Sequence, residues 1–106
     1  MELHTIQATD TVITLLIRGN LDADGSRHAQ QHIDDVIAQD DYQEVEIDFS
    51  GVQFLDSSGV GALVYMYKRL IERERDMRIE NVRGQPLEII NLLRIGQAIP
   101  INSRTQ

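Results

Sequence analysis

Two adjacent serines that follow an aspartate are the side chains best suited to chemistry in this sequence. Ser57 and Ser58 come directly after Asp56 and directly before Gly59. A strand pattern precedes this segment and a helical pattern follows it, so we expect the serines at the amino end of a helix. Free backbone N–H groups and the helix dipole favour negative charge at that position. A serine hydroxyl there can cap the helix, or it can carry a phosphate that the helix end tolerates.

The same serines are poor candidates for hydrolysis. A nucleophilic serine needs a base within hydrogen-bonding reach and a further group that orients the base. Ser57 has Asp56 beside it, but His4 lies near the amino terminus and the other histidines lie on the first predicted helix. A nucleotide-binding loop needs a longer glycine-rich run and a lysine, and the segment 58–61 has neither. We therefore expect no catalytic residue, no cofactor and no enzymatic activity.

One helix face has residues of the kind that bind metals. His28, His32 and Asp35 are spaced i, i+4 and i+7, and two imidazoles four residues apart can share a metal ion. The simpler interpretation is that these residues lie on the solvated side of an amphipathic helix, because nothing else in the sequence completes a ligand set. We expect no metal site.

Composition sets limits on the class of protein. The 106 residues are enough for one hydrophobic core, and the absence of cysteine excludes disulfide and thiol chemistry. No apolar run approaches the roughly 18 residues of a membrane span, and the amino terminus shows no secretory signal. The net charge of −7 would repel a nucleic-acid backbone. We expect a cytoplasmic protein with no direct membrane insertion and no nucleic-acid partner.

Alternating strands and helices are predicted to position the serines. Strands are predicted at Glu2–Ala8, Thr11–Arg18, Glu44–Phe49 and Met77–Val82, and residues 98–102 could form a short edge strand. Helices are predicted from a cap at Asp24 or Ser26 to about Gln39, from Ser57–Ser58 to near Arg75, and over Leu87–Ile95. This order predicts an α/β fold: one domain over residues 1–102, with a mixed sheet of four to five strands and about three helices, and then a polar tail at 103–106.

The second predicted helix has two apolar faces. The face expected to pack on the sheet carries Val60, Leu63, Val64, Tyr67 and Ile71. The other face carries Ala62, Tyr65, Met66 and Arg69. Tyrosine and methionine are common in surfaces that bind other proteins. The second face therefore either docks a partner or is covered by another part of the same chain, and the sequence leaves both open.

The segment from Asp48 to Leu63, DFSGVQFLDSSGVGAL, resembles the signature segment of STAS domains, and more narrowly that of the bacterial anti-sigma factor antagonists. Upstream, the segment from Ile17 to Asp22, IRGNLD, resembles the second strand of that family and the loop after it, usually Gly-x-Leu-Asp. The match in order and spacing covers about residues 1–100.

The resemblance implies a function. In antagonists of this type the serine directly after the aspartate, here Ser57, is phosphorylated by a cognate serine kinase or anti-sigma factor, and a PP2C-type phosphatase removes the phosphate. The unmodified form binds the kinase, and the phosphorylated form releases it. The expected partner-binding residues are Asn20, Leu21, Asp22, Asp56, Ser57, Ser58, Tyr65, Met66 and Arg69. The alternative is a STAS subunit of a membrane transport complex, with a constitutive structural role.

Overall fold

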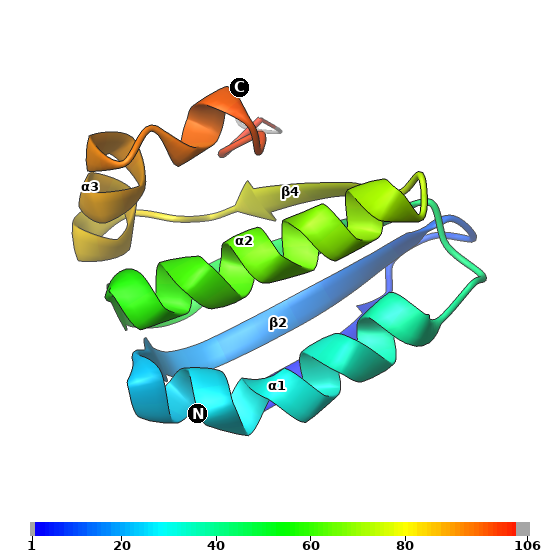
Figure 1. The fold of residues 1–106 in the computed structure, drawn as a ribbon, viewed down its shortest axis with the longest axis horizontal. Coiled ribbons are helices and arrows are strands. Elements are labelled where there is room, and N and C mark those ends of the chain that lie inside the picture. The colour runs from blue at the N-terminus through cyan, green and yellow to red at the C-terminus, as the bar shows by residue number, and fades with distance from the viewer. Residues whose placement is uncertain (1, 104–106) are drawn as a thin grey trace.

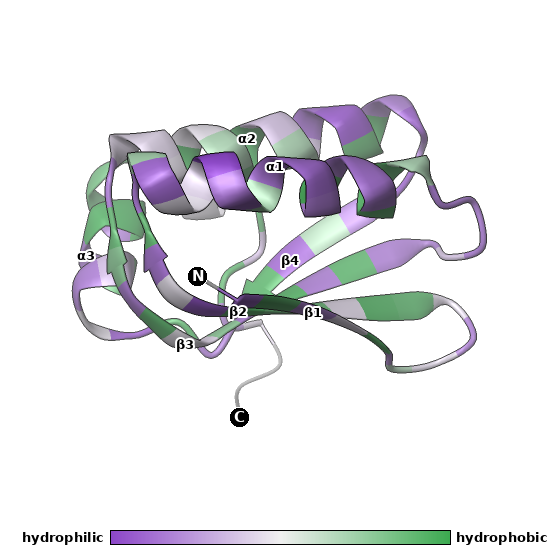
Figure 2. Cartoon of the chain, turned by 90° about the horizontal axis from the view of Figure 1, so that it is seen from below, coloured by the Kyte–Doolittle hydropathy of each residue, from purple (hydrophilic) through white to green (hydrophobic). Residues whose placement is uncertain are grey.

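The structure, a computed structural model that describes residues 2–103, has a mixed sheet with its two long helices on one face (Figures 1 and 2). The strands are β1 (Glu2–Gln7), β2 (Val12–Leu21), β3 (Glu44–Leu55) and β4 (Asp76–Glu80). The helices are α1 (Ala23–Ala38), α2 (Ser57–Glu72) and α3 (Gly84–Leu92), followed by the short 3-10 helix η1 (Ile95–Gln97). The predicted α/β fold, with a mixed sheet and three helices, is confirmed.

The order of the strands brings two helix starts together. The sheet runs β1-β2-β3-β4, with β1 antiparallel to β2 and the other pairs parallel. Because β2 and β3 are parallel, their carboxyl ends meet at the same end of the sheet, where Leu21 pairs with Leu55. Each strand leads directly into its helix, so α1 and α2 start side by side (Figure 1).

The core lies between the sheet and the α1–α2 layer. Hydrophobic and hydrophilic residues alternate along the strands in Figure 2, as expected for strands with one buried face. The buried apolar residues of the two central strands include Ile13, Leu15, Ile17, Val45, Ile47 and Phe49. The helices cover them with Ala29, Ile33 and Val36 from α1 and with Leu63, Met66 and Leu70 from α2. Burying each of the larger side chains contributes roughly 1.5–3 kcal/mol to folding.

Both central strands continue further than predicted. The predicted end of β2 at Arg18 is wrong by three residues, and that of β3 at Phe49 by six. β2 advances from Leu16 to Arg18 while β3 advances from Asp48 to Gly51, so a bulge in β3 breaks the alternation that the prediction followed. A Cβ on Gly51 would lie 2.8 Å from Cγ of Arg18, so the bulge leaves no room for a side chain there.

The elements after α2 also differ from the prediction in their bounds. β4 ends at Glu80 rather than Val82, and α3 begins at Gly84 rather than Leu87, with Pro86 in its first turn. The predicted edge strand at 98–102 is wrong, because only Ile101 pairs there, in a single parallel bridge to Ile79. Of the predicted polar tail, Ser103 donates a hydrogen bond to Oε2 of Glu80 (2.9 Å), and residues 104–106 lie outside the described residues.

Candidate functional site

Ser57 is the first residue of α2. Asp56 is the N-cap, with extended backbone angles, and its Oδ1 accepts a hydrogen bond from the Gly59 N–H at 3.0 Å. The prediction that Ser57 lies at the amino terminus of the second helix is confirmed. The suggestion that a serine caps this helix is wrong, because the carboxylate of Asp56 takes that role. Ser57 and Ser58 are both exposed in the first turn, which contains no acidic residue.

The start of α1 is built in the same way. Asp22 is the N-cap, and its Oδ1 accepts from the Gly25 N–H at 2.8 Å. The predicted cap at Asp24 or Ser26 is therefore wrong by two or more residues. The segment expected to be a loop from Asn20 to Asp22 is the end of β2 followed by this cap. Asn20 is exposed, whereas the Leu21 side chain is only 1% exposed and belongs to the core.

The two helix starts are in direct contact. The Asp56 N–H donates to the Leu21 carbonyl at 3.4 Å. A Cβ on Gly59 would lie 2.0 Å from that carbonyl oxygen and 2.6 Å from Cδ1 of Leu55. Only glycine allows the first turn of α2 to approach the end of β2 so closely. The glycine after the two serines is therefore required by packing, whatever the serines do.

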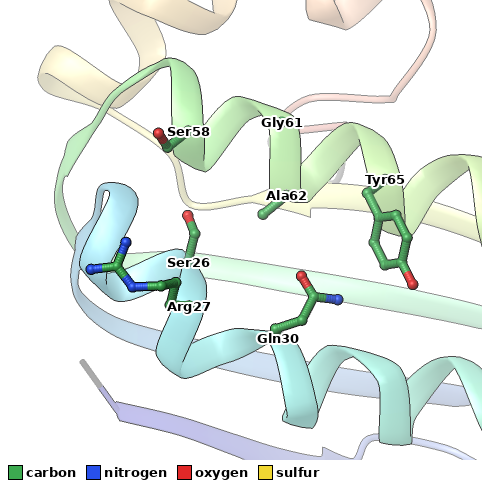
Figure 3. Close-up of a pocket in the computed structure, with 7 residues that line it drawn as sticks. All are labelled: Ser26, Arg27, Gln30, Ser58, Gly61, Ala62 and Tyr65. Carbon is green, nitrogen blue, oxygen red and sulfur yellow. The ribbon is translucent and has the colours of Figure 1, made fainter.

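A groove of about 540 Å³ runs between α1 and α2 beside the serines (Figure 3). The residues that line this α1–α2 groove are Ser26, Arg27, Gln30, Ser58, Gly61, Ala62 and Tyr65. Sequence reasoning missed the α1 contribution of Ser26, Arg27 and Gln30. Two features of the sequence indicate this contribution. The three residues have helical spacing, and residues 21–25 and 55–59 share the pattern Leu-Asp-x-x-Gly, which indicates two equivalent helix starts.

Tyr65 reaches across the groove towards α1. Its hydroxyl donates to Oδ1 of Asp34 at 3.0 Å, and 37% of the side chain stays exposed. The Arg69 guanidinium lies 5.5 Å from the centre of the Tyr65 ring and donates to Oε1 of Glu72 at 3.1 Å. The hydrogen bond to Glu72 raises the pKa of Arg69, a side chain that is a cation at physiological pH even without this contact. Tyr65 and Arg69 form one polar and aromatic surface on α2.

The rest of the predicted second face is not a surface. Met66 is 1% exposed and is not available to a partner, and Ala62 is 8% exposed and contributes only to the floor of the α1–α2 groove. The reason is that α2 packs against the sheet on one side and against α1 on the other. The buried face of α2 therefore differs from the predicted one. Ile71, which was expected in the core, is 45% exposed, and Leu70 is fully buried instead. Met66 and Leu21 are therefore core residues, contrary to the expected partner surface.

The histidines and Asp35 make ordinary local contacts. Nδ1 of His28 lies 2.9 Å from the Asp24 carbonyl oxygen, and Nε2 of His32 lies 2.6 Å from Oγ1 of Thr5. Asp35 accepts from Gln31 at 2.9 Å. Within residues 2–103, no three His, Asp or Glu side chains come together in a way that could hold a metal ion. No helix in that range has the length and hydropathy needed to cross a membrane.

The fold is that of a STAS domain. The match to this domain extends over residues 4–106, so the chain belongs to the STAS domain family. An anti-sigma factor antagonist from Mycobacterium paratuberculosis superposes with a TM-score of 0.80 at 26% identity, over 94% of this chain and 85% of that chain. No curated protein matches the chain by sequence.

Two further solved structures show how widely the fold occurs. The unphosphorylated anti-sigma factor antagonist SpoIIAA superposes with a TM-score of 0.78 at 18% identity, over 94% of this chain and 87% of that chain. The murine anion transporter Slc26a9 superposes with a TM-score of 0.76 at 19% identity, over 89% of this chain but only 16% of the transporter. The same fold thus occurs as an anti-sigma factor antagonist and as a small part of a membrane transporter.

Proposed function

We propose that this chain is a phosphorylation-controlled partner-switching regulator of the anti-sigma factor antagonist type, and not an enzyme. The observation that carries the proposal is the position of Ser57: an exposed hydroxyl at the first position of α2, directly after a cap that Asp56 already supplies. The hydroxyl is not needed to cap the helix, so it is available to a kinase. Likeness to an antagonist that exists in an unphosphorylated form supports this assignment.

A phosphate on Ser57 would act on the contact surface rather than on the fold. It adds a charge of about −1.5 to −2 at neutral pH. Beyond the capping Asp56, the first turn of α2 has no acidic residue, and its remaining free N–H groups and dipole favour an anion. The helix therefore accommodates the phosphate, while a partner that fits a neutral hydroxyl meets new bulk and charge.

The proposed partner is a serine kinase or anti-sigma factor, and a PP2C-type phosphatase would reverse the modification. The surface offered to the kinase comprises Asn20, Asp22, Asp56, Ser57, Ser58, Tyr65 and Arg69, extended by the α1–α2 groove. Leu21 and Met66 support this surface from the core. A kinase that uses ATP implies that the protein acts in the cytoplasm.

The test is phosphate transfer measured by intact mass. The purified chain is incubated with candidate serine kinases and ATP, and the wild type and Ser58→Ala should each gain one phosphate. Ser57→Ala should gain none. Stoichiometric phosphorylation of Ser57→Ala by the same kinase would refute the assignment of the site.

Tyr65 tests the extent of the surface. Tyr65→Ala should weaken kinase binding by more than about 1 kcal/mol if the ring is a binding hot spot, with only a small change in melting temperature. Tyr65→Phe is the matched control, because it keeps the ring and removes the hydroxyl with its hydrogen bond to Asp34. Loss of binding strictly in proportion to loss of folded protein would place Tyr65 in the core instead.

The alternative function, a structural subunit of a membrane transport complex, is favoured by the likeness to part of Slc26a9. A pull-down distinguishes the two. Recovery of a kinase and a phosphatase, in amounts that depend on Ser57, supports the switch. Recovery of a transporter component, unaffected by Ser57→Glu, supports the subunit.

A further inference from the structure

The side chain of Gln85, from the first turn of α3, makes two hydrogen bonds with the backbone of a single residue of β3. Oε1 of Gln85 accepts from the Leu55 N–H at 2.8 Å, and Nε2 of Gln85 donates to the Leu55 carbonyl at 2.7 Å. One carboxamide thus satisfies both backbone groups of the last residue of the strand. The two residues are 30 apart in sequence, so this contact joins parts of the chain that are distant in sequence.

Leu55 needs such a partner because β3 extends beyond the end of the neighbouring strand β4. The pairing of β3 with β4 ends at Asp48 and Glu80, so the rest of β3 has β2 on one side and no strand on the other. In a parallel sheet the N–H and the C=O of one residue point to the same neighbour. Gln85 takes the place of that missing neighbour for Leu55. The Leu55 side chain is fully buried, which makes an unpaired backbone group at this position costly.

The same peptide group leads into the candidate switch. The carbonyl of Leu55 and the N–H of Asp56 belong to one peptide plane. Gln85 holds the carbonyl, and the Leu21 carbonyl accepts from the N–H at 3.4 Å. Asp56 then caps α2, and Ser57 follows as its first residue. With both edges of this plane fixed, the direction in which the chain enters α2 is fixed as well.

We infer that Gln85 is a positioning residue for phosphate transfer to Ser57: it sets the backbone that presents the hydroxyl, without touching the kinase. The inference rests on the proposed function. It assigns part of the switch to α3, an element outside the proposed contact surface. A misplacement of about 1 Å at a reacting group can cost on the order of a hundredfold in rate.

Amide hydrogen exchange tests whether Gln85 holds the backbone at Leu55 in place. In Gln85→Ala the Leu55 amide should exchange at least about tenfold faster, and Asp56 and Gly59 should follow, because their local opening becomes easier. The Ile47 amide, in the part of β3 that β4 covers, should be unchanged. Asn91→Ala, an exposed change on α3, is the matched control. Unchanged exchange at Leu55 in Gln85→Ala would overturn the inference.

Steady-state kinetics test whether Gln85 affects phosphate transfer to Ser57. They use the kinase that phosphorylates the wild type. Gln85→Ala should lower kcat by about tenfold or more with KM within about twofold, because the docking surface is intact and only the hydroxyl is displaced. Gln85→Glu keeps an acceptor for the Leu55 N–H but turns a carboxylate oxygen towards the Leu55 carbonyl oxygen, which repels it, so its kcat should also fall below that of the wild type. Equal kcat for all variants, or a rise in KM alone, would overturn the positioning role. Failure of the proposed function is distinguishable, because it would appear in the wild type, which would gain no phosphate.

Discussion

The two strand-to-helix turns of this protein are nearly identical in construction and differ in their first helical residues. Both have the pattern Leu-Asp-x-x-Gly, at residues 21–25 and 55–59. In both, the leucine is buried and the aspartate caps the helix through the N–H of the glycine. The backbone angles of the caps agree closely, with φ of −108° at Asp22 and −117° at Asp56.

The difference lies at the two positions between cap and glycine. In α1 these are Ala23 and Asp24, and the Asp24 carboxylate forms an ion pair with Arg27. In α2 they are Ser57 and Ser58, and the first turn has no acid. Both helix starts hold the carboxylate of the capping aspartate, but α1 has a second carboxylate in its first turn, whereas α2 has hydroxyls there that could receive a negative charge. The two turns thus share a structural cap and differ in the pair of residues that follows it, and the proposed switch places its phosphorylation site in that pair.

The largest expected effect concerns the glycine that lets the two turns touch. Gly59→Ala should destabilise the fold by roughly 3 kcal/mol or more, because its Cβ would lie 2.0 Å from the Leu21 carbonyl oxygen and the backbone must shift. Gly61→Ala is the matched control two residues later, where a Cβ meets nothing within 4 Å. It should stabilise α2 by roughly 0.5–1 kcal/mol. Urea unfolding of both variants measures this, and equal stabilities would mean that the turns are not in contact.

The next effect is on partner affinity. Ser57→Glu should weaken binding to the kinase by roughly 2–5 kcal/mol, because a desolvated carboxylate would face a surface that fits a hydroxyl. Ser57→Ala should change it by less than about 1 kcal/mol. Ala23→Glu places the same charge at the equivalent position of α1 and should have a smaller effect than Ser57→Glu. Calorimetry with the three variants measures the affinities, and equal affinity for the alanine and glutamate variants at position 57 would remove Ser57 as the switch.

The sequence predicted the order of elements correctly, because strand and helix periodicities are strong over Glu44–Phe49 and from Val60 onwards. It missed the second half of β3, since the bulge between Asp48 and Gly51 breaks the alternation on which the prediction depends. It also chose the wrong caps. Aspartate and serine are both good caps, and three of them stand near each helix start, so only the backbone geometry decides among them.

The site was predicted in part. The position of Ser57 follows from the local sequence pattern and is confirmed. The assignment of Met66 to the surface is wrong. Periodicity shows that a helix face is apolar, but it does not show what covers that face. Here α1 covers it. The groove residues of α1 and the contact of Gln85 with Leu55 arise from tertiary packing between distant segments. The repeated Leu-Asp-x-x-Gly pattern signals the α1 side of the groove, but no local sequence pattern contains the contact between Gln85 and Leu55.

The loss of stability on removing the capping aspartate should be smaller than these effects and equal in the two turns. Asp22→Ala and Asp56→Ala should each destabilise the fold by about 1 kcal/mol, because each removes one capping hydrogen bond to a glycine N–H. Ser58→Ala should cost less than about 0.5 kcal/mol, since Ser58 is not the cap. Denaturant unfolding of the three variants provides the measurement. A large cost for one aspartate and none for the other would contradict the structural equivalence of the turns.

The smallest expected effect separates charge from shape at the first helical position. Ser57→Asp and Ser57→Asn have similar side chains, so the difference in their stabilities isolates the charge. It should favour aspartate by roughly 0.3–1 kcal/mol at low salt, because the first turn of α2 has no acid beyond the capping Asp56. The same pair at Ala23 should differ by less, because Asp24 is adjacent and like charges repel. The helix dipole should lower the pKa of the new carboxylate at position 57, so its contribution is present above the unfolded pKa of about 3.9 and lost as the pH falls through the lower folded value. Melting temperatures of the four variants at neutral and acidic pH measure this, and an equal charge effect at positions 23 and 57 would show that the two turns do not differ in their capacity for an anion.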